Sequence, residues 1–446
     1  MLSGGDEMAN PVTNTDERTR PGTSTARRRY FGTDGVRGVV GDTLTESLVE
    51  RLACAATQWS GRGRVVVGRD TRSSGPALEA AVARGVVRAG GTAVLAGVLP
   101  TPAVALLAQD LGLVVSASHN PPEYNGIKVF DRAGHKLDDA QELEIEALLD
   151  EPGPGGGTVE RADDAVAGYV EHVETHFGSD LSGLRVAVDC ANGAFSAIAP
   201  ALFERLGARV TALANEPDGT NINAGCGATD LALLQEVVRA GTFDLGIAFD
   251  GDGDRMLAVD ATGEPVDGDQ ILAVCALDLG VDLVAVTSMT NLGFHRLMAE
   301  HGIRVLTTDV GDRYVLEALR REGGILGGEQ SGHLIVLDGH VTGDGLAAAL
   351  LLCRSLGGRT LADAVAEMPR FAQVKENVRV TRREVPEAVT QEVERLNAEL
   401  RGDGRVLVRP SGTEPLVRVL AEAERPEEAA ELCGRVAHLL RQELGA

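Results

Sequence analysis

Three aspartates spaced two residues apart form the part of the chain best suited to chemistry: Asp250-Gly251-Asp252-Gly253-Asp254-Arg255. Three carboxylates share a small volume only when positive charge lies among them, and Mg²⁺ prefers oxygen ligands together with a substrate phosphate. An EF-hand calcium loop does not fit, because it requires Gly at position 255 and Glu at position 261. The pattern predicts a site for one divalent cation, with a solvated acidic turn as the alternative.

An apolar run, residues 243–249, precedes the aspartates and predicts a short buried strand. Open α/β sheets bind their ligands at the carboxyl ends of strands, so the carboxylates are expected at a ligand-binding edge. The phosphate that would complete the cation site must come from another part of the chain or from a substrate.

Ser118 is the candidate to carry that phosphate. The segment Ser116-Ala117-Ser118-His119-Asn120-Pro121 follows another apolar run, so the Ser118 hydroxyl is expected at a strand end. Ser118 and His119 suggest a hydrolase pair, but adjacent residues rarely face each other and Gly-x-Ser-x-Gly is absent. A plain polar turn is the other alternative. Downstream, Asn125-Gly126 predicts a turn that brings Lys128 beside this loop, where a cation suits a phosphorylated serine.

Two further loops offer polar groups. A glycine-rich turn, residues 31–38, contains Arg37, although this pattern is also common in structural turns. In residues 327–333, Glu329, Ser331 and His333 alternate and present an acceptor, a hydroxyl and an imidazole, which suit sugar hydroxyls. A structural turn with a hydrogen-bonded histidine is the alternative for this second loop.

A fourth loop, residues 409–415, joins two predicted strands and is suited to an anion. Ser411, Gly412 and Thr413 offer hydroxyls and backbone amides, and Arg409 and Arg418 add planar donors that match phosphate. A polar hairpin loop without a ligand is the alternative.

Composition restricts the possible functions. The chain has 446 residues, 43% apolar residues and a net charge of -24, which opposes binding to nucleic acid or an anionic membrane. Its three lysines include none in a Gly-Lys-Ser/Thr sequence, which excludes a P-loop kinase. Six scattered cysteines without a Cys-x-x-Cys pair predict a reduced, cytoplasmic protein. No apolar run approaches the roughly 18 residues that span a bilayer.

One order of elements recurs three times: an apolar strand, a helix, a glycine, a second strand and a third strand that ends in a polar loop. The repeats begin near residues 64, 185 and 283. They predict three similar mixed-sheet α/β domains around a central cleft, followed by a smaller C-terminal α+β domain. The expected boundaries are a disordered tail 1–28 and domains 29–180, 181–278, 279–370 and 371–446.

These motifs, in this order along residues 29–440, resemble the α-D-phosphohexomutase superfamily. Three segments resemble the members that act on amino sugars: 29–38, 309–315 (Asp-Val-Gly-Asp-Arg-Tyr-Val) and 328–333 (Gly-Glu-Gln-Ser-Gly-His). The resemblance implies an isomerase that interconverts glucosamine 6-phosphate and glucosamine 1-phosphate and supplies amino-sugar nucleotide synthesis. Tyr124 and Asp230 depart from that pattern, so mannose or glucose phosphates remain the alternative substrates.

The resemblance also implies roles for individual residues. Ser118 would carry a phosphate and share one Mg²⁺ with the three aspartates, and glucosamine 1,6-bisphosphate would be the intermediate. The groups implied to stabilise the transferring phosphate or to move the hydroxyl proton are Arg37, His119, Lys128 and Arg255. The groups implied to hold the sugar and its second phosphate are Glu329, Ser331, His333, Arg409, Ser411, Gly412, Thr413 and Arg418. The expected partner is a phosphosugar, and the expected state is a monomer or homodimer.

Two other readings use the same residues. A magnesium-dependent sugar phosphatase would use Asp250, the first residue of an Asp-x-Asp pair, as its nucleophile instead of Ser118. A sugar-phosphate binding protein stabilised by a cation would bind the same ligand without turning it over.

Overall fold

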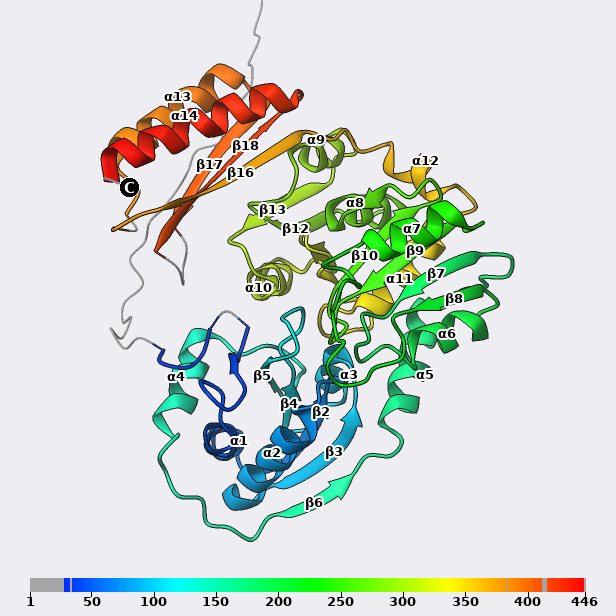
Figure 1. Ribbon diagram of the computed structural model, residues 1–446, viewed down its shortest axis with the longest axis vertical. Coiled ribbons are helices and arrows are strands. Elements are labelled where there is room, and N and C mark those ends of the chain that lie inside the picture. Colours follow the sequence, from blue (N-terminus) through cyan, green and yellow to red (C-terminus); the bar gives the residue numbers. More distant parts are fainter. Residues whose placement is uncertain (1–27, 33, 383, 411–414, 445–446) are drawn as a thin grey trace, which may run out of the picture.

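A computed structural model describes residues 28–32, 34–382, 384–410 and 415–444 of the chain (Figure 1). Of the predicted tail, residues 1–28, the first 27 residues lie outside these ranges. The described residues form four sheets of six, five, four and three strands, each in a separate stretch of sequence. No helix among them is long and apolar enough to cross a membrane.

The first sheet has the strand order β1-β5-β4-β2-β3-β6. Strands β2, β3, β4 and β6 are parallel, whereas β5 runs antiparallel to both β4 and β1. The elements of this unit are β1 (Val36–Val39), α1 (Glu46–Trp59), β2 (Arg64–Arg69), α2 (Gly75–Ala89), β3 (Thr92–Val98), α3 (Thr101–Leu107), β4 (Leu111–Val115), β5 (Tyr124–Asp131), α4 (Asp139–Ala147), β6 (Thr158–Arg161) and α5 (Ala165–Phe177).

The second and third sheets repeat a parallel centre with an antiparallel strand beside it. In the second sheet, β8, β7 and β9 are parallel. Strand β10 pairs antiparallel with β9, and β11 pairs antiparallel with β10. Its elements are β7 (Arg185–Asp189), α6 (Ala199–Arg205), β8 (Arg209–Leu213), α7 (Ala232–Ala240), β9 (Leu245–Phe249), β10 (Met256–Asp260), β11 (Pro265–Val266) and α8 (Gly268–Leu279).

In the third sheet, β13-β12-β14 are parallel and β15 is antiparallel. Its elements are β12 (Leu283–Thr287), α9 (Leu292–Glu300), β13 (Arg304–Thr308), α10 (Asp312–Glu322), β14 (Leu326–Gly328), β15 (Leu334–Val336), α11 (Gly345–Ser355) and α12 (Leu361–Val365). The central strands β7, β9 and β12 are almost wholly buried, as their continuous apolar sequences require.

The C-terminal unit is an antiparallel sheet, β16-β18-β17, with both of its helices on one face (Figure 1). Its elements are β16 (Ala372–Arg379), α13 (Glu387–Leu400), β17 (Gly404–Pro410), β18 (Leu416–Ala423) and α14 (Pro426–Leu444). The unit has its own hydrophobic core, whereas one continuous core runs from Val66 in the first sheet to Met368 after the third. One hydrophobic cluster is thus shared by the first three units, whereas the cluster of the fourth unit contains residues of that unit alone.

The predicted mixed-sheet α/β fold with a smaller C-terminal α+β unit is confirmed. One local prediction was wrong: Asn125-Gly126 is not a turn but part of β5. A Cβ at Gly126 would lie 2.8 Å from the carbonyl oxygens of both Val36 and Ser116. This glycine therefore permits close approach of neighbouring backbone rather than a change of chain direction.

Candidate active site

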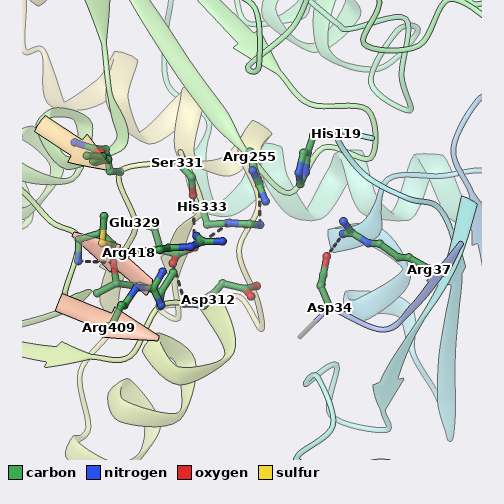
Figure 2. A pocket seen from close by; sticks show the side chains of 16 residues that line it. Asp34, Arg37, His119, Arg255, Asp312, Glu329, Ser331, His333, Arg409 and Arg418 are labelled. Carbon is green, nitrogen blue, oxygen red and sulfur yellow. Dashed lines mark hydrogen bonds and ion pairs between the residues drawn. The ribbon is translucent and has the colours of Figure 1, made fainter. Parts of the chain in front are cut away.

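The predicted polar loops leave the ends of strands and meet at one cavity of about 450 Å³ (Figure 2). The predicted residues that line it are Arg37, His119, Arg255, Glu329, Ser331, His333, Arg409 and Arg418. Ser118, Lys128 and the three aspartates are buried. The predicted phosphate ligands Ser411, Gly412 and Thr413 lie outside the described residues.

Ser118 faces the aspartates across the boundary between the first two units. Its Oγ donates a hydrogen bond to Asp250 Oδ2 at 2.6 Å and lies 3.2 Å from His119 Nδ1. The backbone of Ser118 has φ 52°, in the left-handed region that residues other than glycine seldom adopt. Such a conformation persists only where the surroundings hold it in place.

Arg72 supplies much of that restraint. Its side chain is fully buried, and its guanidinium donates to the carbonyl oxygens of Ser118 at 2.9 Å, Asn120 at 2.7 Å and Tyr124 at 3.0 Å, and also to that of Pro121. A single planar side chain thus fixes four carbonyls of the Ser118 loop. Arg72 was not among the predicted site residues, although it stands in a polar run directly after the apolar part of β2.

The same loop has two further anchors. Asp70 Oδ2 accepts from Arg72 Nε at 2.9 Å and from Ser116 Oγ at 2.5 Å, and Ser116 Oγ accepts in turn from the Ser118 backbone N–H at 2.9 Å. From the second unit, Asn223 Nδ2 donates to the Ser118 carbonyl at 2.9 Å. The position of Ser118 therefore depends on both units.

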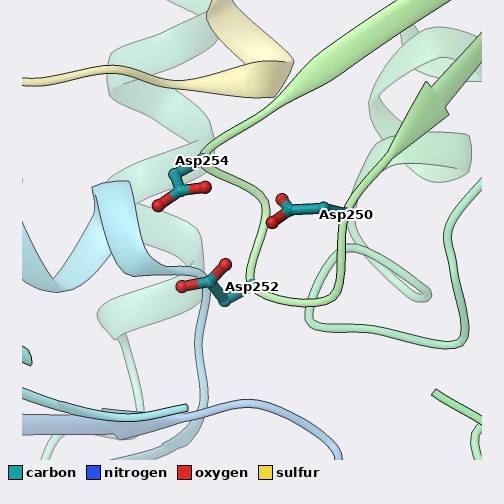
Figure 3. A group of neighbouring side chains, drawn as sticks. All are labelled: Asp250, Asp252 and Asp254. Atoms are coloured by element: carbon teal, nitrogen blue, oxygen red, sulfur yellow. The ribbon is translucent and has the colours of Figure 1, made fainter. Parts of the chain in front are cut away.

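The three aspartates turn their carboxylates toward a common centre (Figure 3). One oxygen from each of Asp250, Asp252 and Asp254 lies within 4.8 Å of the others, and Asp252 Oδ1 is buried without a hydrogen-bond partner among the described residues. Burial, and then the charges of Asp254 and Asp252, raise the pKa of Asp250 to about 8. This crowding of negative charge fits a divalent cation, because a cation would lower the cost of ionising all three.

Lys128 compensates part of this charge. Its Nζ lies 2.7 Å from both Asp252 Oδ2 and Asp254 Oδ2, and 3.4 Å from Asp34 Oδ2. Burial opposes the ammonium, but Asp252 and Asp254 outweigh burial and raise the pKa of Lys128 well above its ordinary value. Lys128 is therefore an ammonium at neutral pH and cannot accept a proton there.

The two histidines of the site differ in charge. Burial opposes protonation of His333, but Asp254 outweighs it and raises the pKa of this imidazole to about 10. His333 bridges Asp254 Oδ1 at 3.1 Å and Glu329 Oε2 at 3.2 Å, so both of its nitrogens are engaged. Burial, and then Arg255, lower the pKa of His119 to about 4, so His119 is neutral at neutral pH.

Two arginines, Arg409 and Arg418, lie together on the side of the cavity opposite Asp34 and Arg37 (Figure 2). Arg409 and Arg418 are directly paired across β17 and β18. Burial, and then the nearby charge of Arg418, lower the pKa of Arg409. Paired guanidinium groups of this kind favour an anion with several oxygens, such as phosphate.

Charged side chains also join the first unit to the third. Lys136 Nζ lies 2.7 Å from Asp34 Oδ1 and 2.7 Å from Asp312 Oδ2, and Arg313 donates to the Leu137 carbonyl at 3.2 Å. Asp34 and Asp312 line the cavity, yet the sequence analysis assigned them no role. Their only sequence signal was their position in segments already noted, residues 31–38 and 309–315.

Comparison with known sequences identifies the class of protein. Models of phosphoglucomutase/phosphomannomutase alpha/beta/alpha domains I, II and III match residues 28–153, 167–263 and 267–371, and the model of the C-terminal domain matches residues 375–439. The chain therefore belongs to the phosphoglucomutase/phosphomannomutase family. The predicted resemblance to the α-D-phosphohexomutase superfamily is confirmed.

Within this family the chain is similar to proteins named phosphoglucosamine mutase. The protein of that name from Saccharopolyspora erythraea is 50% identical over 439 residues, with 92% of this chain and 99% of the relative covered. The one from Bacillus subtilis is 44% identical over 447 residues, with 94% and 99% covered. These matches extend over nearly the whole of both relatives.

Solved structures share the architecture. A phosphoglucomutase/phosphomannomutase family protein from Burkholderia thailandensis superposes with a TM-score of 0.78 at 26% identity, covering 91% of this chain and 96% of that one. N-acetylphosphoglucosamine mutase from Aspergillus fumigatus, in complex with GlcNAc-6P and magnesium, gives a TM-score of 0.71 at 19% identity, covering 94% and 96%. At this low identity the second likeness shows the fold alone.

The contacts of Arg72 predict a large loss of stability when its charge is removed. Arg72→Met leaves Asp70 as a buried, unpaired carboxyl and removes the donor from four carbonyls. We expect the free energy of unfolding, measured by urea denaturation, to fall by about 3–5 kcal/mol. The double variant Arg72→Met/Asp70→Asn should recover part of the loss.

Arg185→Met is the matched control, because Arg185 pairs with Asp244 through a similar two-point contact that is partly exposed. It should cost no more than about 1 kcal/mol. Equal losses in the Arg72 and Arg185 variants would contradict the structural role assigned to Arg72.

Proposed function

We propose that the protein interconverts glucosamine 6-phosphate and glucosamine 1-phosphate by two phosphoryl transfers through Ser118. The observation that carries this proposal is the hydrogen bond from Ser118 Oγ to Asp250 in a cluster suited to a cation, at a cavity that also contains paired arginines. Relatives 43–50% identical over nearly their full length carry the name phosphoglucosamine mutase, which supports the amino sugar as substrate.

In this mechanism phosphorylated Ser118 gives its phosphate to a sugar hydroxyl, and the resulting 1,6-bisphosphate turns over before its other phosphate returns to Ser118. Asp250, Asp252 and Asp254 would hold one Mg²⁺, which supplies positive charge to the transferring phosphate when it is bound. Arg37 and Arg255 line the same part of the cavity and would add donors to that phosphate. Lys128 would balance part of the negative charge of the aspartates.

His119 is the residue best placed to accept the proton of the Ser118 hydroxyl when the second phosphate returns to Ser118. Its neutral imidazole can accept a proton, and its Nδ1 lies 3.2 Å from Ser118 Oγ. Lys128 and His333 are already protonated at neutral pH because of their aspartate partners. Among the candidates that the sequence left open, His119 is therefore favoured.

The remaining residues would position the sugar. Glu329 and Ser331 line the cavity and offer oxygen atoms to sugar hydroxyls. Arg409 and Arg418 would hold the phosphate that is not reacting, together with Ser411, Gly412 and Thr413. A separate hydrophobic core for the C-terminal unit suits a clamp that opens while the bisphosphate turns over.

The proposed setting is the cytoplasm, with a monomer or homodimer as the active form. All six cysteines are free in the structure, which is the pattern expected of a reducing compartment.

Equilibration followed by ³¹P NMR tests the proposed reaction. The protein is incubated with Mg²⁺, a trace of hexose bisphosphate and, separately, the 6-phosphates of glucosamine, mannose and glucose. We expect the glucosamine 1-phosphate signal to appear fastest, and to vanish with Ser118→Ala or with a chelator. Faster conversion of mannose 6-phosphate would contradict the proposed substrate, and release of inorganic phosphate alone would indicate a phosphatase.

Substitution of Arg409 tests the phosphate clamp. Arg409→Ala should raise KM for glucosamine 6-phosphate about tenfold or more, because a charge-assisted contact to the distal phosphate is lost, while kcat falls less. Arg379→Ala is the matched control, since Arg379 is an exposed residue of the same sheet outside the cavity. An unchanged KM in the Arg409 variant would overturn the assignment.

A further inference from the structure

Asp312 is a cavity residue whose role the proposed mechanism leaves open. It is the first residue of α10, and its carboxylate lines the cavity together with only two other acidic side chains among the described residues, Asp34 and Glu329. The rest of the charged lining is mainly cationic, as two phosphates require. A carboxylate in such a cavity repels phosphate, so each of its oxygens needs a positive group or a donor beside it, from the protein or from the ligand.

Each oxygen of the other two acidic groups already has a partner within the protein. Asp34 Oδ1 accepts from Lys136 at 2.7 Å, and its Oδ2 accepts from Arg37 and lies 3.4 Å from Lys128. Glu329 Oε1 accepts from the Gly311 backbone N–H at 3.0 Å.

The other oxygen of Glu329, Oε2, lies 3.2 Å from His333 Nδ1. Neither Glu329 nor Asp34 therefore has an oxygen without a cation or a backbone N–H beside it.

Asp312 differs from both. Its Oδ2 accepts from Lys136 at 2.7 Å, and no described residue donates a hydrogen bond to its Oδ1. Burial would raise the pKa of Asp312, but Lys136 and then His333 outweigh it and lower the pKa below its ordinary value, so the carboxylate is charged. Asp312 thus presents one ionised oxygen that can take a donor from a ligand.

The position of Asp312 matches the place of a sugar ring. In Figure 2 it lies between the Arg409 and Arg418 side chains and the Asp34 and Arg37 side chains, which come from opposite sides of the cavity. A hexose with one phosphate at the paired arginines and the other near Arg37 would pass Asp312.

We propose that Asp312 Oδ1 accepts a hydrogen bond from the 2-ammonium group of a hexosamine phosphate and so selects amino sugars over neutral hexoses. This inference rests on the proposed function and deepens it. The ammonium is the one positive group of such a substrate. A bond between two ionised partners is stronger than the bond that a neutral 2-hydroxyl would make, and a site built for a donor discriminates against a ligand that lacks it.

Asp312→Asn tests the inference, since it removes the charge and nearly conserves the shape. We expect the ratio of kcat/KM for glucosamine 6-phosphate to kcat/KM for glucose 6-phosphate to fall about ten- to a hundredfold. Where glucose 6-phosphate turns over too slowly, its inhibition constant replaces kcat/KM. Asp312→Glu keeps the charge and should restore part of the preference.

Asp139→Asn is the matched control. Asp139 also accepts from a cation across the same boundary, Arg313 of the third unit, but it does not line the cavity. The Asp139→Asn variant should show the same sugar preference as the unaltered protein. An Asp312→Asn variant that loses activity equally on both sugars, or that keeps the preference, would overturn the inference.

Asp312→Asn removes one of the two acidic partners of Lys136 and leaves Asp34. The double variant Lys136→Gln/Asp312→Asn removes both charges of the Lys136–Asp312 pair and so guards against misfolding caused by an unbalanced ammonium. It should show the same fall in preference, and a retained preference in a folded double variant would equally overturn the inference. Failure of the proposed function gives a different result: the unaltered protein would then convert mannose or glucose phosphates and leave glucosamine 6-phosphate unchanged.

Discussion

Ser118 and Asp250 are 132 residues apart in the sequence, and their hydrogen bond joins the first two units of the chain. The proposed phosphoryl transfer requires this contact to be rigid. Several contacts fix it. The Thr101 backbone N–H donates to the Asp252 carbonyl at 2.9 Å, Asn223 donates to the Ser118 carbonyl, and Lys128 reaches the aspartates from β5. A shared hydrophobic core supports this boundary. In-line phosphoryl transfer depends on such positioning, because the protein contributes mainly orientation and charge.

The second requirement is charge balance. The chain carries a net charge of -24, yet its active cavity must hold an anionic sugar phosphate. The protein meets this by placing cations locally: Lys128 and His333 contact the aspartates, and Arg409 and Arg418 line the cavity. A cation that enters the aspartate cluster must therefore share carboxylates already partnered by Lys128 and His333. Metal binding and the protonation of these groups are linked for the same reason.

A site residue could be predicted from the sequence when its role depends on neighbours in the chain, and not when its partners lie far away in the sequence. Asp250 and Ser118 could be predicted, because each stands just after an apolar strand and strand ends gather at ligand-binding edges. Arg72 could not, since its partners are carbonyls 46 to 52 residues away, and carbonyls have no sequence signature. Asp312 pairs with Lys136 across 176 residues, which no local pattern reveals.

For the fold as well, elements set by local sequence could be predicted, whereas those set by long-range contacts could not. Parallel central strands such as β7 and β12 were predicted from apolar runs that open the repeats near residues 185 and 283, and the two strands begin at these positions in the structure. Residues 125–126, which lie in β5, were predicted to form a turn, because Asn-Gly is a common turn pair. The structure instead uses Gly126 for close packing between β1 and the Ser116 loop, a tertiary contact that overrides the local preference.

The central claim is that Ser118, and not an aspartate, carries the phosphate. Mass spectrometry of peptides from the purified protein, after incubation with a hexose bisphosphate and Mg²⁺, tests it most directly. We expect phosphate on Ser118, and none on the same peptide of a Ser118→Ala variant. An unmodified Ser118 under these conditions, or phosphate trapped on Asp250, would show that Ser118 is not the residue that carries the phosphate.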